Sequence, residues 1–168
     1  MSFTLDRALA AEPKVLANGM KSFDYFRKLA GSPKLDEFFV DTGDLAALLP
    51  GLPLAGDSAL DKLTMLADNS YRTYAVCLSR WNASGGLERK RDIQIPAPVK
   101  RGLFDGLALI EIWVIDPPVV STPGDQVVEP LHLALTYTDE KLEFDERASS
   151  ELGRLLEGLG YEFEGRWG

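Results

Sequence analysis

The chain has 168 residues, of which 45% are hydrophobic and 26% charged, and its formal net charge is −8. The composition is near the average for globular proteins and excludes a disordered or fibrous chain. The acidic balance argues against a nucleic-acid partner, because binding to phosphates needs clustered Lys and Arg. The length predicts a single domain over 1–168, with a helical part over about 1–70 and a sheet plus C-terminal helix over about 71–168.

The first part of the chain is predicted to be mostly helical. Ser32-Pro33 is a typical helix start, because Ser can cap and Pro suits the first helical position. The apolar face of that helix would hold Leu35, Phe38 and Phe39. Apolar residues at helical spacing predict four helices in all, over about 23–30, 33–39, 45–49 and 58–69.

From residue 71 the apolar pattern takes the period of strands. Leu107–Ile115 is apolar on both faces, which predicts the central strand of the sheet. Leu131–Thr138 alternates, with His132 on the wetter face. The predicted strands cover 71–81, 93–95, 107–115 and 131–138, and a helix over about 146–159 and a short strand around 161–163 follow. This order predicts an α+β fold with a mainly antiparallel sheet of four to five strands.

Cysteine, histidine and glycine usage argue against cofactors and metals. Cys77 and His132 are single residues of their kinds, so neither a disulfide nor a typical zinc site is expected. No glycine-rich loop opens a helix, so no phosphate or dinucleotide site is expected. The chain also lacks an apolar run of about 20 residues and a signal-like start, which predicts a cytoplasmic protein without membrane contact.

Charge is unevenly distributed along the chain. Residues 35–61 contain six acids and no Lys or Arg, whereas residues 89–101 contain five bases and one acid. Such runs are usually solvated loops and helix faces, but they also guide partners of opposite charge. The basic run makes Arg89, Lys90 and Arg91 candidate binding residues.

The connection between residues 116 and 130 is long for a loop inside a compact domain, and it carries four prolines and two Val-Val pairs. Exposed valine pairs would suggest a partner surface or contact with a second copy of the chain. The alternative is that they fold back as a long hairpin. On the first interpretation the binding residues are Val119, Val120, Val127 and Val128.

Asp41-Thr42-Gly43, preceded by Phe38-Phe39-Val40, resembles the Asp-Thr-Gly signature of the aspartic proteases. The resemblance covers about seven residues and implies that Asp41 shares a proton with a second copy of the motif, supplied by dimerisation. That family also implies an all-β chain, whereas the motif lies here among predicted helices. The alternative is a helix break in which Thr42 or Asp44 caps the Leu45–Leu49 helix.

Glu111 is unusual because it stands between Ile110 and Ile112 in the predicted central strand. A carboxylate there must be paired, hydrogen-bonded or protonated. It is either the structural partner of Arg72 or Arg80 or an acid/base group with a raised pKa.

The sequence therefore favours a non-enzymatic protein that binds a protein partner or associates with itself, such as an immunity or inhibitor protein. One alternative is a small hydrolase or isomerase that uses Glu111 and His132, with Arg80 or Tyr137 assisting. Another is a small-ligand binder, in which Trp81 and Trp113 line a pocket.

Overall fold

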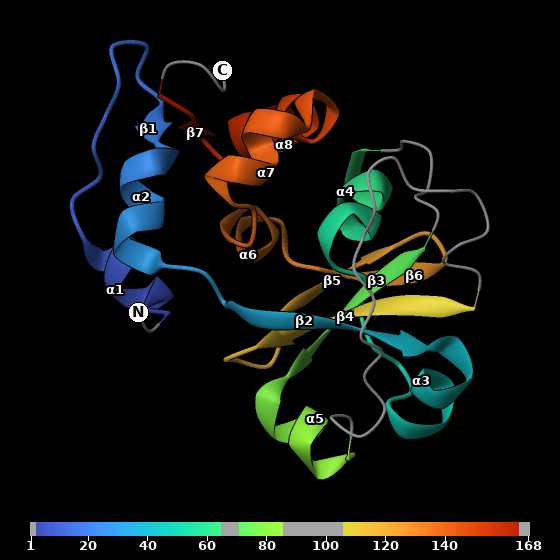
Figure 1. The fold of residues 1–168 in the computed structure, drawn as a ribbon. Coiled ribbons are helices and arrows are strands. Elements are labelled where there is room, and N and C mark those ends of the chain that lie inside the picture. Colours follow the sequence, from blue (N-terminus) through green and yellow to red (C-terminus); the bar gives the residue numbers. More distant parts are fainter. Residues whose placement is uncertain (1–2, 65–70, 86–105, 165–168) are drawn as a thin grey trace. The chain divides into compact units, whose positions relative to one another are not determined.

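The computed structural model describes residues 3–64, 71–85 and 106–164, and it confirms the α+β class (Figure 1). The helices are α1 (Leu5–Ala10), α2 (Phe23–Ala30), α3 (Thr42–Leu48), α4 (Gly56–Thr64), α5 (Leu78–Ala83), α6 (Pro130–Leu135), α7 (Asp139–Phe144) and α8 (Glu146–Gly158). The strands are β1 (Lys21–Ser22), β2 (Lys34–Asp41), β3 (Arg72–Cys77), β4 (Leu107–Trp113), β5 (Val119–Thr122), β6 (Asp125–Val128) and β7 (Tyr161–Glu162).

Contacts within the chain group the residues into two compact units. Residues 34–129 form the first, called here the sheet unit, and residues 1–33 with 130–168 form the second, called the terminal unit. The prediction of one domain over the whole chain stays a prediction.

The sheet unit is built on β4, which lies between β2 and β3 as the sequence predicted for its central strand. β2 pairs with β4 in the antiparallel direction, and β3 pairs with β4 in the parallel direction. Leu54 forms single bridges to Tyr74 of β3 and to Val127 of β6, so the β5–β6 hairpin continues the sheet beyond β3. The five strands therefore run in mixed directions.

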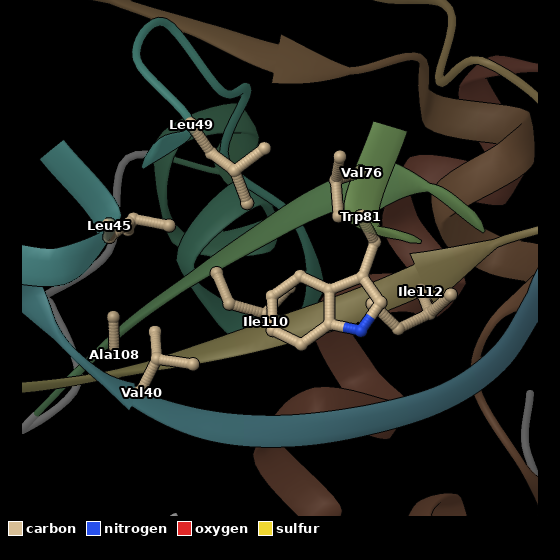
Figure 2. Packing of buried hydrophobic residues seen from close by; sticks show 8 residues of the cluster. All are labelled: Val40, Leu45, Leu49, Val76, Trp81, Ala108, Ile110 and Ile112. Atoms are coloured by element: carbon tan, nitrogen blue, oxygen red, sulfur yellow. The ribbon is translucent and has the colours of Figure 1, made fainter. Parts of the chain in front are cut away.

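The two faces of this sheet are covered differently (Figure 1). Alternate residues of β4, among them Ile110 and Ile112, point toward α3 and α5. Figure 2 shows the resulting apolar cluster, which contains Val40, Leu45, Leu49, Val76, Trp81, Ala108, Ile110 and Ile112. The opposite face carries Glu111 and Trp113, and α4 lies over it.

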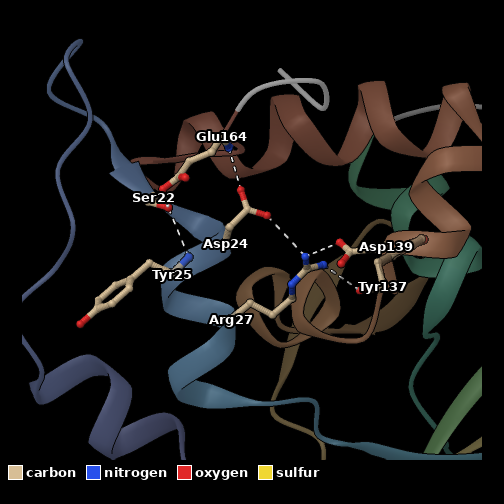
Figure 3. A network of polar contacts seen from close by, with 7 residues as sticks. All are labelled: Ser22, Asp24, Tyr25, Arg27, Tyr137, Asp139 and Glu164. Carbon is tan, nitrogen blue, oxygen red and sulfur yellow. Dashed lines mark hydrogen bonds and ion pairs between the residues drawn. The ribbon is translucent and has the colours of Figure 1, made fainter.

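The terminal unit joins the two ends of the chain. β1 pairs with β7 in parallel, and Phe23 of α2 meets Phe163 edge-on at 5.5 Å between ring centroids. Polar contacts reinforce this joint (Figure 3). Asp24 accepts from the Glu164 backbone N–H over 2.7 Å, and Arg27 donates to the Tyr137 carbonyl over 3.3 Å. The ends are therefore held by both aromatic packing and charge.

The predicted helix over 33–39 is wrong, because these residues form β2. Phe38 stacks on Trp81 with 6.0 Å between ring centroids, whereas Phe39 meets Tyr71 at 5.3 Å. Neighbouring side chains of a strand point to opposite faces of the sheet. Phe38 and Phe39 can therefore both be covered, one by Trp81 and the other by Tyr71. The apolar residues were compatible with helical spacing, but pairing with β4 decided the structure.

The predicted strand over 131–138 is also wrong, because α6 begins at Pro130. His132, Leu133, Ala134 and Leu135 are all buried, so the alternation of the sequence does not correspond to an inner and an outer face. Proline is well suited to the first turn of a helix. The first predicted strand likewise ends early, at Cys77, where α5 follows.

The predicted helices over 23–30 and 146–159 are observed as α2 and α8, and the short strand near residue 161 is observed as β7. The strand expected at 93–95 lies outside the described residues.

Candidate functional site

Glu111 occupies the middle of β4 and is 3% exposed. Trp113 Nε1 donates to Glu111 Oε1 over 3.0 Å, and Lys34 Nζ lies 4.0 Å from Oε2. Burial raises the pKa of the Glu111 carboxyl, and the indole and Lys34 offset this only in part. The nearby carboxylates of Glu37 and Asp57 raise the pKa further. The net shift is therefore toward the neutral form of the carboxyl.

The prediction that Arg72 or Arg80 pairs with Glu111 is wrong. Arg72 Nη1 lies 3.6 Å from Asp125 Oδ1 instead. Arg80 belongs to α5, which packs on the opposite face of the sheet, and it donates to the Pro50 carbonyl over 2.8 Å. Among the described residues, the nearest cation is Lys34, which lies on β2.

Gly56 at the start of α4 closes the space around Glu111. Its φ is +52°, and a Cβ added there would lie 3.1 Å from Glu111 Oε2 and 3.2 Å from Thr73 Cγ2. The first turn of α4 thus rests directly on the buried carboxyl. We interpret Glu111 as a structural group that α4 covers.

A Gly56→Ala substitution is expected to lower the free energy of unfolding by about 2 kcal/mol, from the left-handed backbone and the close contacts together. Gly51→Ala is the matched control, because Gly51 also has a positive φ of +76° but no neighbour within 4 Å of its Cβ position. Urea unfolding of both variants measures the difference. Equal losses would show that the contact with Glu111 contributes nothing.

The other acid/base candidates belong to other elements of the chain than Glu111. His132 is buried in α6 of the terminal unit, where its ring lies 5.8 Å from that of Phe3. The prediction that it sits on the wetter face of a strand is therefore wrong. Tyr137 is also buried in the terminal unit, and Arg80 is exposed on α5. Because Glu111 belongs to the sheet unit, a shared acid/base site with His132 stays a prediction.

Trp81 and Trp113 lie on opposite faces of the sheet. Trp81 packs among the apolar residues beneath α3 and α5, and Trp113 bonds to Glu111 on the other face. Both indoles are buried. The geometry therefore gives no support to a pocket that both rings would line.

The Asp-Thr-Gly motif marks the junction between β2 and α3. Asp41 is the N-cap of α3 but makes no side-chain cap hydrogen bond, and Thr42 is the first helical residue. The Thr42 hydroxyl donates to the Gly106 carbonyl over 3.2 Å. The motif therefore lies between a strand and a helix, so the expected break between two helices is wrong, as is the prediction that Thr42 or Asp44 caps the helix.

The two Val-Val pairs lie in the β5–β6 hairpin. This is the alternative in which the valine pairs fold back as a long hairpin. Val119 pairs with Val128 and Val120 with Val127 across the ladder. Val127 and Val128 are fully buried, because β6 lies against Leu54, whereas Val119 is 42% exposed. β5 is therefore the outer strand of the hairpin.

Hydrogen bonds fix the direction of the backbone groups on β5. Gln126 and Val128 of β6 bond through their backbones to Leu54, at 2.9 Å in each case. In an antiparallel ladder, the residues opposite them, Ser121 and Val119, point their N–H and C=O groups away from β6. No described residue bonds to these four groups. We call the backbones of Val119 and Ser121 the β5 edge.

The two outer strands of the sheet differ in how their edges are protected. β2 has a register shift around Leu35 and exposed acids at Asp36 and Glu37. Bulges and charges of this kind prevent pairing with other chains. β5 reads Val-Val-Ser-Thr and contains no charged residue. The lack of charge in this segment could be seen in the sequence. The sequence did not show which of the four valines face the core.

Comparison of the chain with protein-family models, curated proteins and solved structures found no match. No helix in the described ranges is both long and apolar enough to span a bilayer. Arg89, Lys90 and Arg91 lie outside the described residues. Among the candidate sites within the described residues, the β5 edge is the one that the geometry supports best.

Proposed function

We propose that the protein binds an extended segment of a protein partner, which adds a strand to the β5 edge. The observation that carries the proposal is the set of outward backbone groups on Val119 and Ser121, in a strand without charge. Strand addition of this kind draws affinity from main-chain hydrogen bonds and specificity from alternate side chains. An immunity or inhibitor protein that blocks its target would use such an edge.

A partner protein suits this edge better than a second copy of the chain. Two β5 strands related by a two-fold axis at Val120 would form about four hydrogen bonds, worth about 0.5–1.5 kcal/mol each. This gain is small against the roughly 4–15 kcal/mol that association loses in translational and rotational freedom. The same holds for a strand of another protein, so either complex needs further attraction, and charge distinguishes the two. Two copies also repel each other, since each carries a net charge of −8. A basic partner is attracted instead.

Ser121→Pro is expected to abolish partner binding without unfolding the protein. The Ser121 N–H points outward, so proline removes the donor that the partner strand needs and leaves the ladder with β6 intact. Val120→Pro is the contrasting variant, because the Val120 N–H points into the ladder and its loss destabilises the hairpin. Thermal unfolding of both variants separates the two effects.

Binding is measured by photo-cross-linking in the cell that makes the protein. A benzophenone amino acid placed at Val119 is expected to capture the partner, and the capture should disappear with Ser121→Pro. The matched control position is Val114, a valine of the same unit with 41% exposure against 42% for Val119. Equal capture from both positions would overturn the proposal, and capture of a second copy would reassign the edge to self-association.

A further inference from the structure

A small pocket of about 160 Å³ lies in the terminal unit, where residues of α1, α2, β1, β7 and the connection after α1 line it. The apolar part of its lining includes Leu9, Phe26, Leu29 and Tyr161. This volume is below the range of about 300–1,000 Å³ typical of sites for larger ligands, but a cavity of about 150 Å³ can hold one benzene ring. The pocket therefore suits a ligand with a single ring.

Hydrogen bonds hold the walls of this pocket in place. The Thr4 N–H donates to the Ala30 carbonyl and the Thr4 hydroxyl to the Leu29 carbonyl, both over 2.8 Å, so the start of α1 is tied to the end of α2. The Ser22 N–H donates to the Lys14 carbonyl over 2.7 Å, which ties the connection after α1 to β1. Because the walls are already fixed to one another, little further ordering opposes the binding of a ligand.

Aromatic side chains line the pocket from two elements. Phe26 of α2 and Tyr161 of β7 are buried, and their ring centroids lie 5.0 Å apart with an interplanar angle of 44°. Tyr25 contributes a third ring, which is 39% exposed. Aromatic rings pack on one another in tilted or offset pairs that gain more than apolar burial alone provides. The lining therefore favours an aromatic ring over a linear aliphatic chain.

Lys21 brings a positive charge to the pocket. Its partner in the β1–β7 ladder is Tyr161, and the Lys21 Nζ lies 5.0 Å from the centre of the Tyr161 ring. Lys21 makes no ion pair with a described residue, whereas Lys14, which also lines the pocket, lies 2.8 Å from Glu164 Oε1. Glu12 is an exposed acid of the lining and opposes an anion only in part, because solvent screens its charge. An anionic group can therefore pair with Lys21 beside the apolar lining.

We propose that this pocket binds a small aromatic carboxylate. The ring packs on Phe26 and Tyr161, and the carboxylate accepts from the Lys21 ammonium. A single lysine matches one negative charge, whereas a phosphate group is usually held by several donors. The pocket belongs to the terminal unit, so this proposal does not depend on strand addition at the β5 edge of the sheet unit.

The probes are phenylacetate and its neutral amide, phenylacetamide, with binding followed by NMR titration of the isotope-labelled chain. The acid is expected to bind more tightly than the amide and to shift the backbone amide signals of the lining residues. Lys21→Gln should weaken binding of the acid by about fivefold and binding of the amide by less than about twofold, because only the acid loses an ion pair. Lys28→Gln is the matched control, since Lys28 is exposed on α2 outside the lining, and it should change neither affinity by more than about twofold.

A second pair of variants tests whether the ring occupies the pocket. Ala11→Leu enlarges a lining side chain and is expected to weaken the acid and the amide alike by about tenfold, because it fills space that the ring needs. Ala10→Leu is the same change at an exposed position outside the lining, and it should alter both affinities by less than about twofold. Absence of binding to the unmodified chain, equal affinities of the acid and the amide, or equal effects within either pair of variants would overturn the proposal.

Discussion

Truncation of Trp81 to alanine is expected to lower the free energy of unfolding by about 3–5 kcal/mol. The indole is buried between α5 and the sheet, where it contacts the cluster that includes Val76 and Ile110. It also stacks on Phe38 of β2 with an interplanar angle of 18°. Because α5 has only six residues, this one side chain supplies most of its attachment.

Urea unfolding measures the loss, and two further variants calibrate it. Trp81→Phe should lose less than half as much, because it keeps an aromatic ring and removes an indole N–H that is buried without a hydrogen-bond partner in the described structure. Leu78→Ala on the exposed side of α5 should change stability by no more than about 0.5 kcal/mol. A loss below about 1 kcal/mol for Trp81→Ala would contradict the packing of α5.

Replacement of Glu111 by glutamine is expected to stabilise the protein increasingly as the pH rises. Burial raises the pKa of this carboxyl above its ordinary value of about 4.3. Between these two pKa values the folded state binds one more proton than the unfolded state, so the unmodified protein loses stability as pH rises. Glutamine does not titrate, and it keeps an acceptor for the Trp113 indole.

The stability difference between Glu111→Gln and the unmodified protein should therefore grow by up to about 1.4 kcal/mol per pH unit above pH 4.3. It levels off above the pKa that the carboxyl has in the folded state. The amide also replaces the oxygen near Lys34 by an N–H₂ group, and the cost of this change does not depend on pH and does not alter the slope. Urea unfolding at several pH values measures the slope. A difference that falls with pH would show that Lys34 dominates over burial.

The sequence predicted those elements whose pattern reflects their surroundings directly. β4 is apolar on both faces because it is central and covered on both sides. α8 shows an apolar stripe over thirteen residues, which is long enough for a clear helical period. Segments 33–39 and 131–138 are shorter and fit more than one period. Their structures were decided by β4 and by burial in the terminal unit, which no local pattern reveals.

The candidate sites were predicted only in part for the same reason. Glu111 stood out as a charge among apolar residues, but its cation, Lys34, is distant in sequence and enters through β2. The valine pairs marked the hairpin, but the bridge from Leu54 to Val127 decided which strand is buried.

Hydrogen exchange at the β5 edge tests the central claim most directly. In the protein alone, the amides of Val119 and Ser121 should exchange quickly, whereas the Val120 amide should exchange slowly because it bonds within the ladder. Addition of the purified partner captured at Val119 should slow both outward amides to the rate of Val120. If the partner binds while Val119 and Ser121 continue to exchange quickly, strand addition at β5 is contradicted.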